Sequence, residues 1–413
     1  MVAYQREQLA RLLNHANAFV PFYKNRLNWV IRNDGSVNWN RWRDIPIVTR
    51  KDLLEKHKSM QATQMLPAYG AIGKFSSSGT TGTPVKTTHN AYASWVNRAA
   101  VMRSYQWHKI DFNKNLCELY LMKNPQEAAY PEGKLIGSWG PAWDHHQTGK
   151  FWQLERTTPL DLYFKFLMDR RISYIAMRPK PAQTVALAAQ KFGIKLKLDG
   201  VITVGANVGL DDRKACMEAF GAKMMASYNS KEGHKMATQC PMGNHYHMMS
   251  ECSLLEILDN NNEPCRPGEV GRVVVTPFFS FAQPLIRYEQ GDLVERGEPC
   301  KCGRTLPVIN RIVGRSAHMF RFPNGMKIAP MLPIPCREAL GATIWQVAQT
   351  APLTIEIRYC SGQEATEAAK AYVTEQIPKN MYANVEVVFK KWDIIPSDDK
   401  FNEYVCELPD EVP

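Results

Sequence analysis

Between residues 172 and 227, short apolar strands alternate with amphipathic helices, and this alternation constrains the fold more than any other feature. Residues 172–177, 201–204 and 223–227 are typical of strands, and residues 183–192 and 211–220 between them are typical of helices. A strand–helix–strand order requires crossover connections and therefore predicts a largely parallel sheet. Ligands of such sheets bind beyond the carboxyl ends of the strands.

The flanking segments complete a large N-terminal domain. Leu9, Leu12 and Leu13 recur with helical spacing and predict a helix over residues 4–18. After residue 252, strand-like segments split by glycine and proline predict a β-rich subdomain at residues 254–258, 272–276 and 285–288. Together with the parallel-sheet block they form the predicted domain of residues 1–314, which contains mixed and parallel sheets.

A small α+β domain is predicted for residues 315–413. It begins with a hairpin whose strands, residues 319–322 and 327–328, flank a turn containing Asn324 and Gly325. A helix, a strand, a second helix and a second strand are expected at residues 331–341, 353–359, 364–376 and 384–389. The predicted fold class is therefore α/β, with a large N-terminal domain and a small C-terminal domain.

Composition and charge exclude several classes of protein. No apolar run in the 413 residues approaches the roughly 18 that a membrane span needs, and the N-terminus carries charges where a signal peptide would be apolar. We therefore expect a cytoplasmic protein with no membrane partner. The net charge is +11, but the basic residues are scattered, so nucleic acid is not an expected partner. The sequence leaves the oligomeric state open, a homodimer included.

Small polar residues and glycine fill seven consecutive positions before Pro84: Ser77, Ser78, Gly79, Thr80, Thr81, Gly82 and Thr83. Glycine lets the backbone curl around an anion, and successive N–H groups then form a nest for phosphate. The hydroxyls add neutral donors, and Lys86 adds a positive charge. The segment predicts a nucleoside triphosphate site, although it lacks the Lys-Ser/Thr pair of the G-x-x-x-x-G-K-[ST] loop.

This loop and four later segments resemble, in order, the motifs of the adenylate-forming superfamily, which contains acyl-CoA synthetases, nonribosomal adenylation domains and luciferases. The later segments are Tyr228 to Glu232, Pro284 to Asp292, Arg311 to Arg315 and Pro396 to Lys400. The segments Val20 to Tyr23 and Cys300 to Arg304 are similar to those of the phenylacetate–CoA ligase-like branch.

The resemblance implies an ATP-dependent, AMP-forming ligase with Mg²⁺ as cofactor and a mobile C-terminal lid. It would adenylate a small, aromatic carboxylic acid and pass the acyl group to CoA, a carrier-protein thiol or an amine. The implied catalytic residues are Lys400, Glu232 and Thr81, with Glu232 also holding Mg²⁺. The implied nucleotide contacts are the loop residues 77–82, Lys86, Gly205, Ala206, Asn207, Tyr228, Asn229, Ser230, Lys231, Asp292, Arg311 and Arg315.

Three positions depart from the superfamily pattern. Lys231 stands where Thr or Ser is usual, Asp399 replaces a glycine before Lys400, and Ala317 occupies a hinge position that is commonly charged. Two alternatives therefore stay open: adenylation of an unusual acid such as nitrite, and a nucleotide-binding relative without ligase activity. The acid itself cannot be identified, because Trp139, Trp143, His145 and His146 fit an acid-binding wall or an aromatic core equally well.

Cysteines and histidines in two segments predict a structural zinc site. Cys300 and Cys302 are too close in sequence for an unstrained disulfide, whereas zinc takes four nitrogen or sulfur ligands. Resemblance to the phenylacetate–CoA ligase-like branch implies Cys240, His247, Cys300 and Cys302 as ligands, with His245 as the rival of His247. Four protein ligands leave no open position, so the metal would be structural. Free thiols on a loop are the alternative.

Overall fold

The computed structural model describes residues 1–76, 84–120, 124–140, 148–203, 205–315, 318–328, 330, 332–342, 344–382, 384–392 and 403–409. These residues form two compact units. Unit 1 contains the described residues of Met1–Ser77, Val85–Gln290 and Glu295–Ile312. Unit 2 contains the described residues of Ser78–Pro84, Gly291–Val294 and Val313–Pro413.

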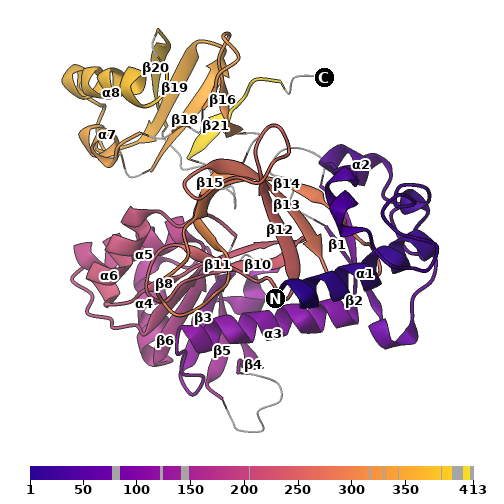
Figure 1. Cartoon of the computed structure of the whole chain (residues 1–413). Coiled ribbons are helices and arrows are strands. Elements are labelled where there is room, and N and C mark those ends of the chain that lie inside the picture. The colour runs from indigo at the N-terminus through magenta and orange to yellow at the C-terminus, as the bar shows by residue number, and fades with distance from the viewer. Residues whose placement is uncertain are drawn as a thin grey trace. The chain divides into compact units, whose positions relative to one another are not determined.

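The predicted parallel sheet lies in unit 1 and has six strands in the order β4-β5-β3-β6-β7-β8 (Figure 1). The strands are β3 (Asn115–Tyr120), β4 (Lys134–Ser138), β5 (Lys150–Glu155), β6 (Ile172–Met177), β7 (Gly200–Thr203) and β8 (Met224–Met225). All neighbours pair in parallel except β4, which joins β5 antiparallel. The crossover helices are α4 (Leu160–Asp169), α5 (Pro179–Lys191) and α6 (Leu210–Phe220), and α5 packs against α6. The mixed α/β class is confirmed.

A second sheet has seven strands in the order β12-β13-β14-β15-β11-β10-β9. Its strands are β9 (Ser227–Ser230), β10 (His234–Gln239), β11 (Tyr246–Met248), β12 (Ser253–Leu258), β13 (Val270–Pro277), β14 (Tyr288–Gly297) and β15 (Val308–Arg315). Consecutive valines make β13 hydrophobic on both faces, and Val273, Val274 and Val275 are fully buried. Such a strand belongs in the middle of a core rather than at its surface.

The N-terminal region of unit 1 supplies three helices and a hairpin. The helices are α1 (Val2–Phe19), α2 (Arg50–Glu55) and α3 (Ala91–Trp107), and the hairpin joins β1 (Ile72–Ser76) to β2 (Lys86–Asn90). Short 3₁₀ turns occur at Pro21–Tyr23, Trp39–Asp44, Pro67–Tyr69 and Pro125–Ala128. The predicted first helix is confirmed, and Leu9, Leu12 and Leu13 are part of its buried face. Helix α3 packs against β2 and β10 (Figure 1).

Unit 2 has its own sheet and its own core. The four-stranded sheet has the order β20-β19-β18-β21, with β18 (Ile344–Ala351), β19 (Thr354–Cys360), β20 (Glu386–Lys391) and β21 (Tyr404–Cys406). Helices α7 (Ile334–Ala339) and α8 (Glu367–Asn380) pack against each other. The predicted hairpin is present as β16 (Phe320–Arg321) and β17 (Lys327–Ile328), and Gly325 in its turn has a φ of 80°. The fully buried Phe320 anchors this hairpin in the core of the unit.

The expected strand at residues 285–288 is wrong, because β14 begins only at Tyr288. Arg287 has a φ of 52°, which lies in the left-handed region rather than the extended one, and it directly precedes the first residue of β14. Its side chain is only 2% exposed: Nε lies 3.2 Å from Glu256 Oε2, and Nη1 donates to the carbonyls of Arg43 and Ile45 at 2.6 and 2.9 Å. A buried cation with three acceptors thus fixes a turn in this segment. The apolar residues Leu285 and Ile286 have the sequence pattern of a strand but lie before β14 begins.

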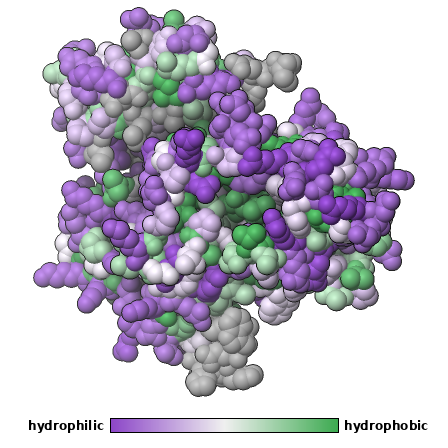
Figure 2. All heavy atoms as spheres, in the orientation of Figure 1, coloured by the Kyte–Doolittle hydropathy of each residue, from purple (hydrophilic) through white to green (hydrophobic). Residues whose placement is uncertain are grey.

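No helix in the part of the chain that the structure describes is both long enough and apolar enough to cross a bilayer. The face shown in Figure 2 is mostly hydrophilic, with hydrophobic residues in patches between hydrophilic ones.

Replacing Arg287 with methionine is expected to lower the free energy of unfolding by about 3–5 kcal/mol, because Glu256 and two carbonyls lose a buried partner. The measurement is the urea midpoint of the variant against wild type. Arg41→Met is the matched control: its ion pair with Asp44 is about half exposed and should contribute at most about 1 kcal/mol. Equal effects of the two substitutions would contradict the assignment.

Candidate functional site

The turn after β7 lies at the carboxyl edge of the parallel sheet, where a ligand site is expected. Gly205 has a φ of 72°, and Gly205, Ala206 and Asn207 are all exposed. Asn207 fixes the turn, since its Oδ1 accepts from Val208 N at 3.0 Å and its Nδ2 donates to Ile312 O at 2.8 Å. The turn is thereby anchored to β15 while its residues stay open to solvent.

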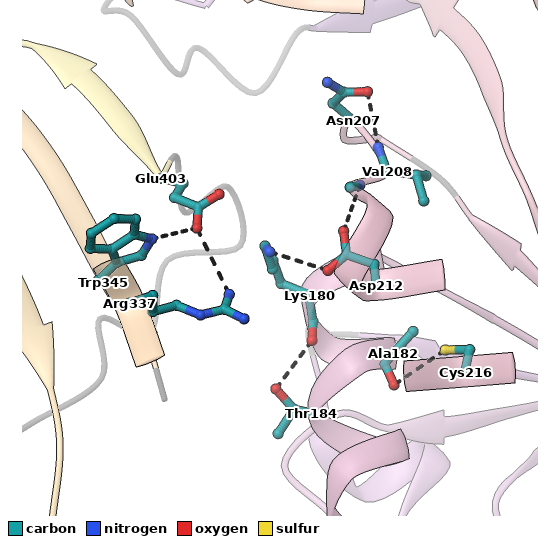
Figure 3. A network of polar contacts seen from close by, with 11 residues as sticks. Lys180, Ala182, Thr184, Asn207, Val208, Asp212, Cys216, Arg337, Trp345 and Glu403 are labelled. Carbon is teal, nitrogen blue, oxygen red and sulfur yellow. Dashed lines mark hydrogen bonds and ion pairs between the residues drawn. The ribbon is translucent and has the colours of Figure 1, made fainter. Parts of the chain in front are cut away.

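The start of α6 is fixed by Asp212, which is 1% exposed (Figure 3). Gly209 N donates to its Oδ2 at 2.8 Å, and Lys180 Nζ lies 3.1 Å from its Oδ1. A carboxylate at this end of a helix satisfies free N–H groups and complements the helix dipole. The figure also shows the separate contact of Trp345 Nε1 with Glu403 in unit 2, at 2.6 Å.

The segment from Tyr228 to Glu232 forms the second strand-to-turn junction. Tyr228 lies in β9 and is 6% exposed, and Glu232 is equally buried in the turn before β10. Ser230 Oγ accepts from Gly233 N at 2.7 Å and donates to Gln290 Oε1 at 3.0 Å. Asn229 and Lys231 are exposed. The segment is therefore tied to Gln290, the residue that precedes Gly291 and Asp292.

The arginines from the last part of the second sheet have different partners. In unit 2, Arg315 Nε lies 3.0 Å from Asp292 Oδ1. In unit 1, Arg311 Nε lies 2.6 Å from Glu295 Oε2, and this contact lowers the pKa of Glu295. Arg315 is thus placed directly on Asp292, whereas the guanidinium of Arg311 is engaged by another carboxylate.

Several predicted site residues lie outside the described part of the chain: Ser77, Ser78, Gly79, Thr80, Thr81, Gly82, Trp143, His145, His146, Ala317, Asp399 and Lys400. Lys86 is described and exposed, and it pairs with Ser76 across the β1–β2 hairpin. Trp139 packs against Phe112 and Tyr174, and its Nε1 donates to Lys114 O at 2.7 Å. Of the two interpretations of this tryptophan, its surroundings match the aromatic core.

Five metal-ligand side chains meet between the β10–β11 hairpin and the segment after β14. The ligand atoms of Cys240, His245, His247 and Cys300 all lie within 4.8 Å of one another. His245 Nε2 lies 3.0 Å from Cys300 Sγ, His247 Nε2 lies 3.3 Å from Cys302 Sγ, and the sulfurs of Cys240 and Cys300 are 3.9 Å apart. Nitrogen and sulfur ligands of one tetrahedral zinc lie roughly 3.3–3.8 Å apart. The cluster therefore has the dimensions of a zinc site.

His245 and His247, the two rival ligands of the sequence analysis, both lie in the cluster with Cys240 and Cys300, and Cys302 joins it through its contact with His247. His247 is fully buried on β11, opposite Thr238 of β10, and His245 lies two residues earlier. Burial opposes ionisation of Cys302, yet contacts with Arg304, Cys300 and Cys240 lower its pKa to about 7. A thiolate is the form of cysteine that binds metal.

The chain is similar to known proteins both in sequence and in fold. A scan of protein-family models gave no match. A phenylacetate–coenzyme A ligase from Thermus thermophilus is 27% identical to the chain over 336 residues, which are 77% of the chain and 71% of the ligase. The chain is similar to this ligase over most of both sequences, and it has the fold of adenylate-forming enzymes.

Solved structures agree with this fold. A 2-hydroxyisobutyryl-CoA ligase in complex with 2-HIB-AMP superposes with a TM-score of 0.76 at 18% identity, over 99% of this chain and 89% of that one. An anthranilate–CoA ligase in complex with anthranoyl-AMP gives a TM-score of 0.54 at 15% identity, over 82% of this chain and 66% of that one. The fold is thus shared along almost the whole chain.

Sequence reasoning missed one residue next to the expected nucleotide segment. Lys235 lies three positions after Glu232 on β10 and is only 3% exposed. The sequence alone contains a single usable signal, a lysine among residues that are otherwise compatible with a buried strand. Its burial could not be read from composition, because lysine side chains are almost always exposed.

Proposed function

We propose that the chain is an ATP-dependent, AMP-forming ligase that adenylates a small carboxylic acid and transfers the acyl group to CoA. The observation that supports this proposal is that hydrogen bonds connect the expected nucleotide segments to one another, in a chain that is similar to a phenylacetate–CoA ligase. Asn207 is bonded to Ile312, and Ser230 to Gln290. Transfer to a carrier-protein thiol or an amine is the same chemistry with another nucleophile.

In the first step, a carboxylate oxygen of the acid forms a bond to the α-phosphorus of ATP, and the bond to the pyrophosphate oxygen breaks. In the second, the thiol sulfur bonds to the acyl carbon, AMP leaves and the thiol proton is released. Both steps build charge on oxygen, so catalysis is mainly positioning and electrostatic stabilisation. Magnesium bound by oxygen ligands would neutralise phosphate charge in the first step.

In this proposal each described residue has a separate part. The exposed turn at Gly205 to Asn207 and the ring of Tyr228 border the adenine. Glu232 supplies the carboxylate for Mg²⁺, and Asp292 accepts from the ribose hydroxyls while Arg315 orients it. Residues 315–413 act as the lid, and Lys400, outside the described residues, contacts the reacting carboxylate.

The Cys/His cluster is proposed to hold one structural zinc ion. Cys240, Cys300 and Cys302 with His245 or His247 supply the four donors that a closed tetrahedral site needs, with one histidine to spare. The ion would link the β10–β11 hairpin to the segment between β14 and β15, and so stabilise the sheet that carries Tyr228 and Gln290. Its role would be in folding, with no part in acyl transfer.

Glu232→Gln is expected to lower the rate of ATP–pyrophosphate exchange by about 10²-fold or more, because an amide is a poor ligand for Mg²⁺. Exchange is measured with a panel of aromatic and aliphatic acids at several Mg²⁺ concentrations. Glu218→Gln, an exposed position on α6, is the control and should leave the rate unchanged. Nucleotide binding without exchange for any acid, unaltered in Lys400→Ala, would favour the relative without ligase activity.

The purified protein is expected to contain about one zinc ion per chain, measured by inductively coupled plasma mass spectrometry. Cys300→Ser should remove most of the zinc and lower the melting temperature, because the binding energy of a structural zinc contributes to folding. Cys406→Ser, in unit 2, is the matched control and should retain the metal. A metal-free wild type whose melting temperature is insensitive to chelator would disprove the site.

A further inference from the structure

The C-terminal end of α3 packs against the Cys/His cluster. The rings of Trp107 and His247 are perpendicular, with an interplanar angle of 88° and centroids 5.8 Å apart. The next residue along the chain, His108, has its Nε2 3.2 Å from the carbonyl oxygen of Gln239, and because a carbonyl only accepts, this nitrogen is the donor. Gln239 directly precedes Cys240. Two consecutive residues at the end of α3 therefore contact the segments of two candidate metal ligands.

Two arginines lie over the ring of Trp107. Cζ of Arg304 is 4.5 Å and Cζ of Arg103 is 5.0 Å from the ring centroid, distances at which a cation and an aromatic ring attract each other. Arg103 also forms an ion pair with Glu251. Arg304 instead hydrogen-bonds the sulfur of Cys302, through both its backbone N–H and its side chain. Trp107 is thus in contact with the ring of one candidate ligand and with the arginine that bonds another.

Contacts of this kind determine how tightly a metal site binds. The groups that orient metal ligands hold them in the binding geometry, and their loss typically weakens metal binding about 10–100-fold. His247 is fully buried in β11, and the perpendicular ring of Trp107 limits rotation of its imidazole. Arg304 holds the sulfur of Cys302, which lies 3.3 Å from His247 Nε2. Together Trp107 and Arg304 keep two donors at a separation that suits one tetrahedral ion.

Helix α3 also connects this end of the Cys/His cluster to the β1–β2 hairpin. The helix begins at Ala91, directly after β2, and it has 17 residues, which is a length of about 25 Å. The β1–β2 hairpin contains the segment predicted to bind phosphate. An ion that orders Trp107 therefore fixes the far end of the helix that starts at this hairpin.

We propose that Trp107 and Arg304 are positioning residues of the metal site: they hold His247 and Cys302 in the geometry that binds the ion, and through Trp107 the bound ion fixes the C-terminal end of α3. This inference rests on the proposed zinc site and does not depend on the ligase activity. Neither residue is itself a ligand; each acts through a ligand that it contacts.

The first test measures zinc affinity by competition with a chromophoric chelator. Trp107→Leu and Arg304→Met are each expected to weaken zinc binding about 10-fold or more, and Trp107→Phe, which retains an aromatic ring, should recover most of the loss. Trp95→Leu is the matched control. Trp95 lies on the same helix with Cζ of Arg98 5.4 Å from its ring centroid, but it is 57% exposed, so its substitution should leave zinc affinity unchanged.

The second test separates positioning from a general loss of stability. The visible absorption bands of the cobalt(II)-substituted protein report ligand geometry, and Trp107→Leu is expected to shift them while Trp95→Leu does not. Removing zinc from the wild type should speed amide hydrogen exchange at residues 101–108. Trp107→Leu should show that faster exchange with zinc still bound, because the link between the ion and the helix is lost.

The outcomes distinguish this inference from the zinc site itself. Equal zinc affinity and equal cobalt spectra in wild type and Trp107→Leu would overturn the inference and leave the site in place. An equal loss of affinity in Trp95→Leu would also count against it, since that residue contacts no candidate ligand. A wild type that binds neither zinc nor cobalt would overturn the site and the inference together, while ATP–pyrophosphate exchange tests the ligase function separately.

Discussion

The path of the chain from Pro284 to Asp292 depends on one buried guanidinium. Arg287 binds Glu256 and the carbonyls of Arg43 and Ile45, and in doing so holds the N-terminal segment against the second sheet. Backbone hydrogen bonds connect the same two segments: Val48 N donates to Arg287 O, and Glu289 N donates to Val48 O, both at 2.9 Å. Gln290, which bonds Ser230, follows directly. The position of this nucleotide segment therefore depends on residues far earlier in the chain.

Long-range contacts of this kind explain where the sequence predicted the fold and where it did not. Residues 172–177 were predicted to the residue, because both faces of β6 are buried and the apolar run ends at a proline-led helix. The false strand at residues 285–288 arose because Leu285 and Ile286 are buried by tertiary contacts rather than by sheet pairing. Strand β18 was missed because Val347 and Gln349, which lie on the same face, are one apolar and one polar residue, and Gln349 is buried through bonds to Arg321 that no local pattern reveals.

The sequence could predict the part of the candidate site whose residues lie in short, recognisable motifs. Tyr228, Glu232 and Asp292 were predicted because their motifs lie in recognisable order, and the metal cluster because thiols two residues apart suit zinc better than a disulfide. All five candidate ligands were named from the sequence, but the choice between His245 and His247 was left open. His245 lies just before β11 begins, so no strand pattern could place it near Cys300. The partners of Arg311 and Arg315 likewise depend on three-dimensional contacts rather than on spacing.

The two buried basic side chains of unit 1 differ in how far the protein itself supplies their hydrogen-bond partners. Arg287 has a carboxylate and two carbonyls around it, so its burial is compensated within the protein and it serves to hold a turn. Lys235 has one hydroxyl, two neutral titratable neighbours and a cavity the size of one oxygen. The protein leaves this charge incompletely satisfied, at a cost in stability that apolar residues of similar volume would avoid. Burial lowers the pKa of Lys235 to about 7, so loss of its proton is one way in which this site reduces that cost near neutral pH.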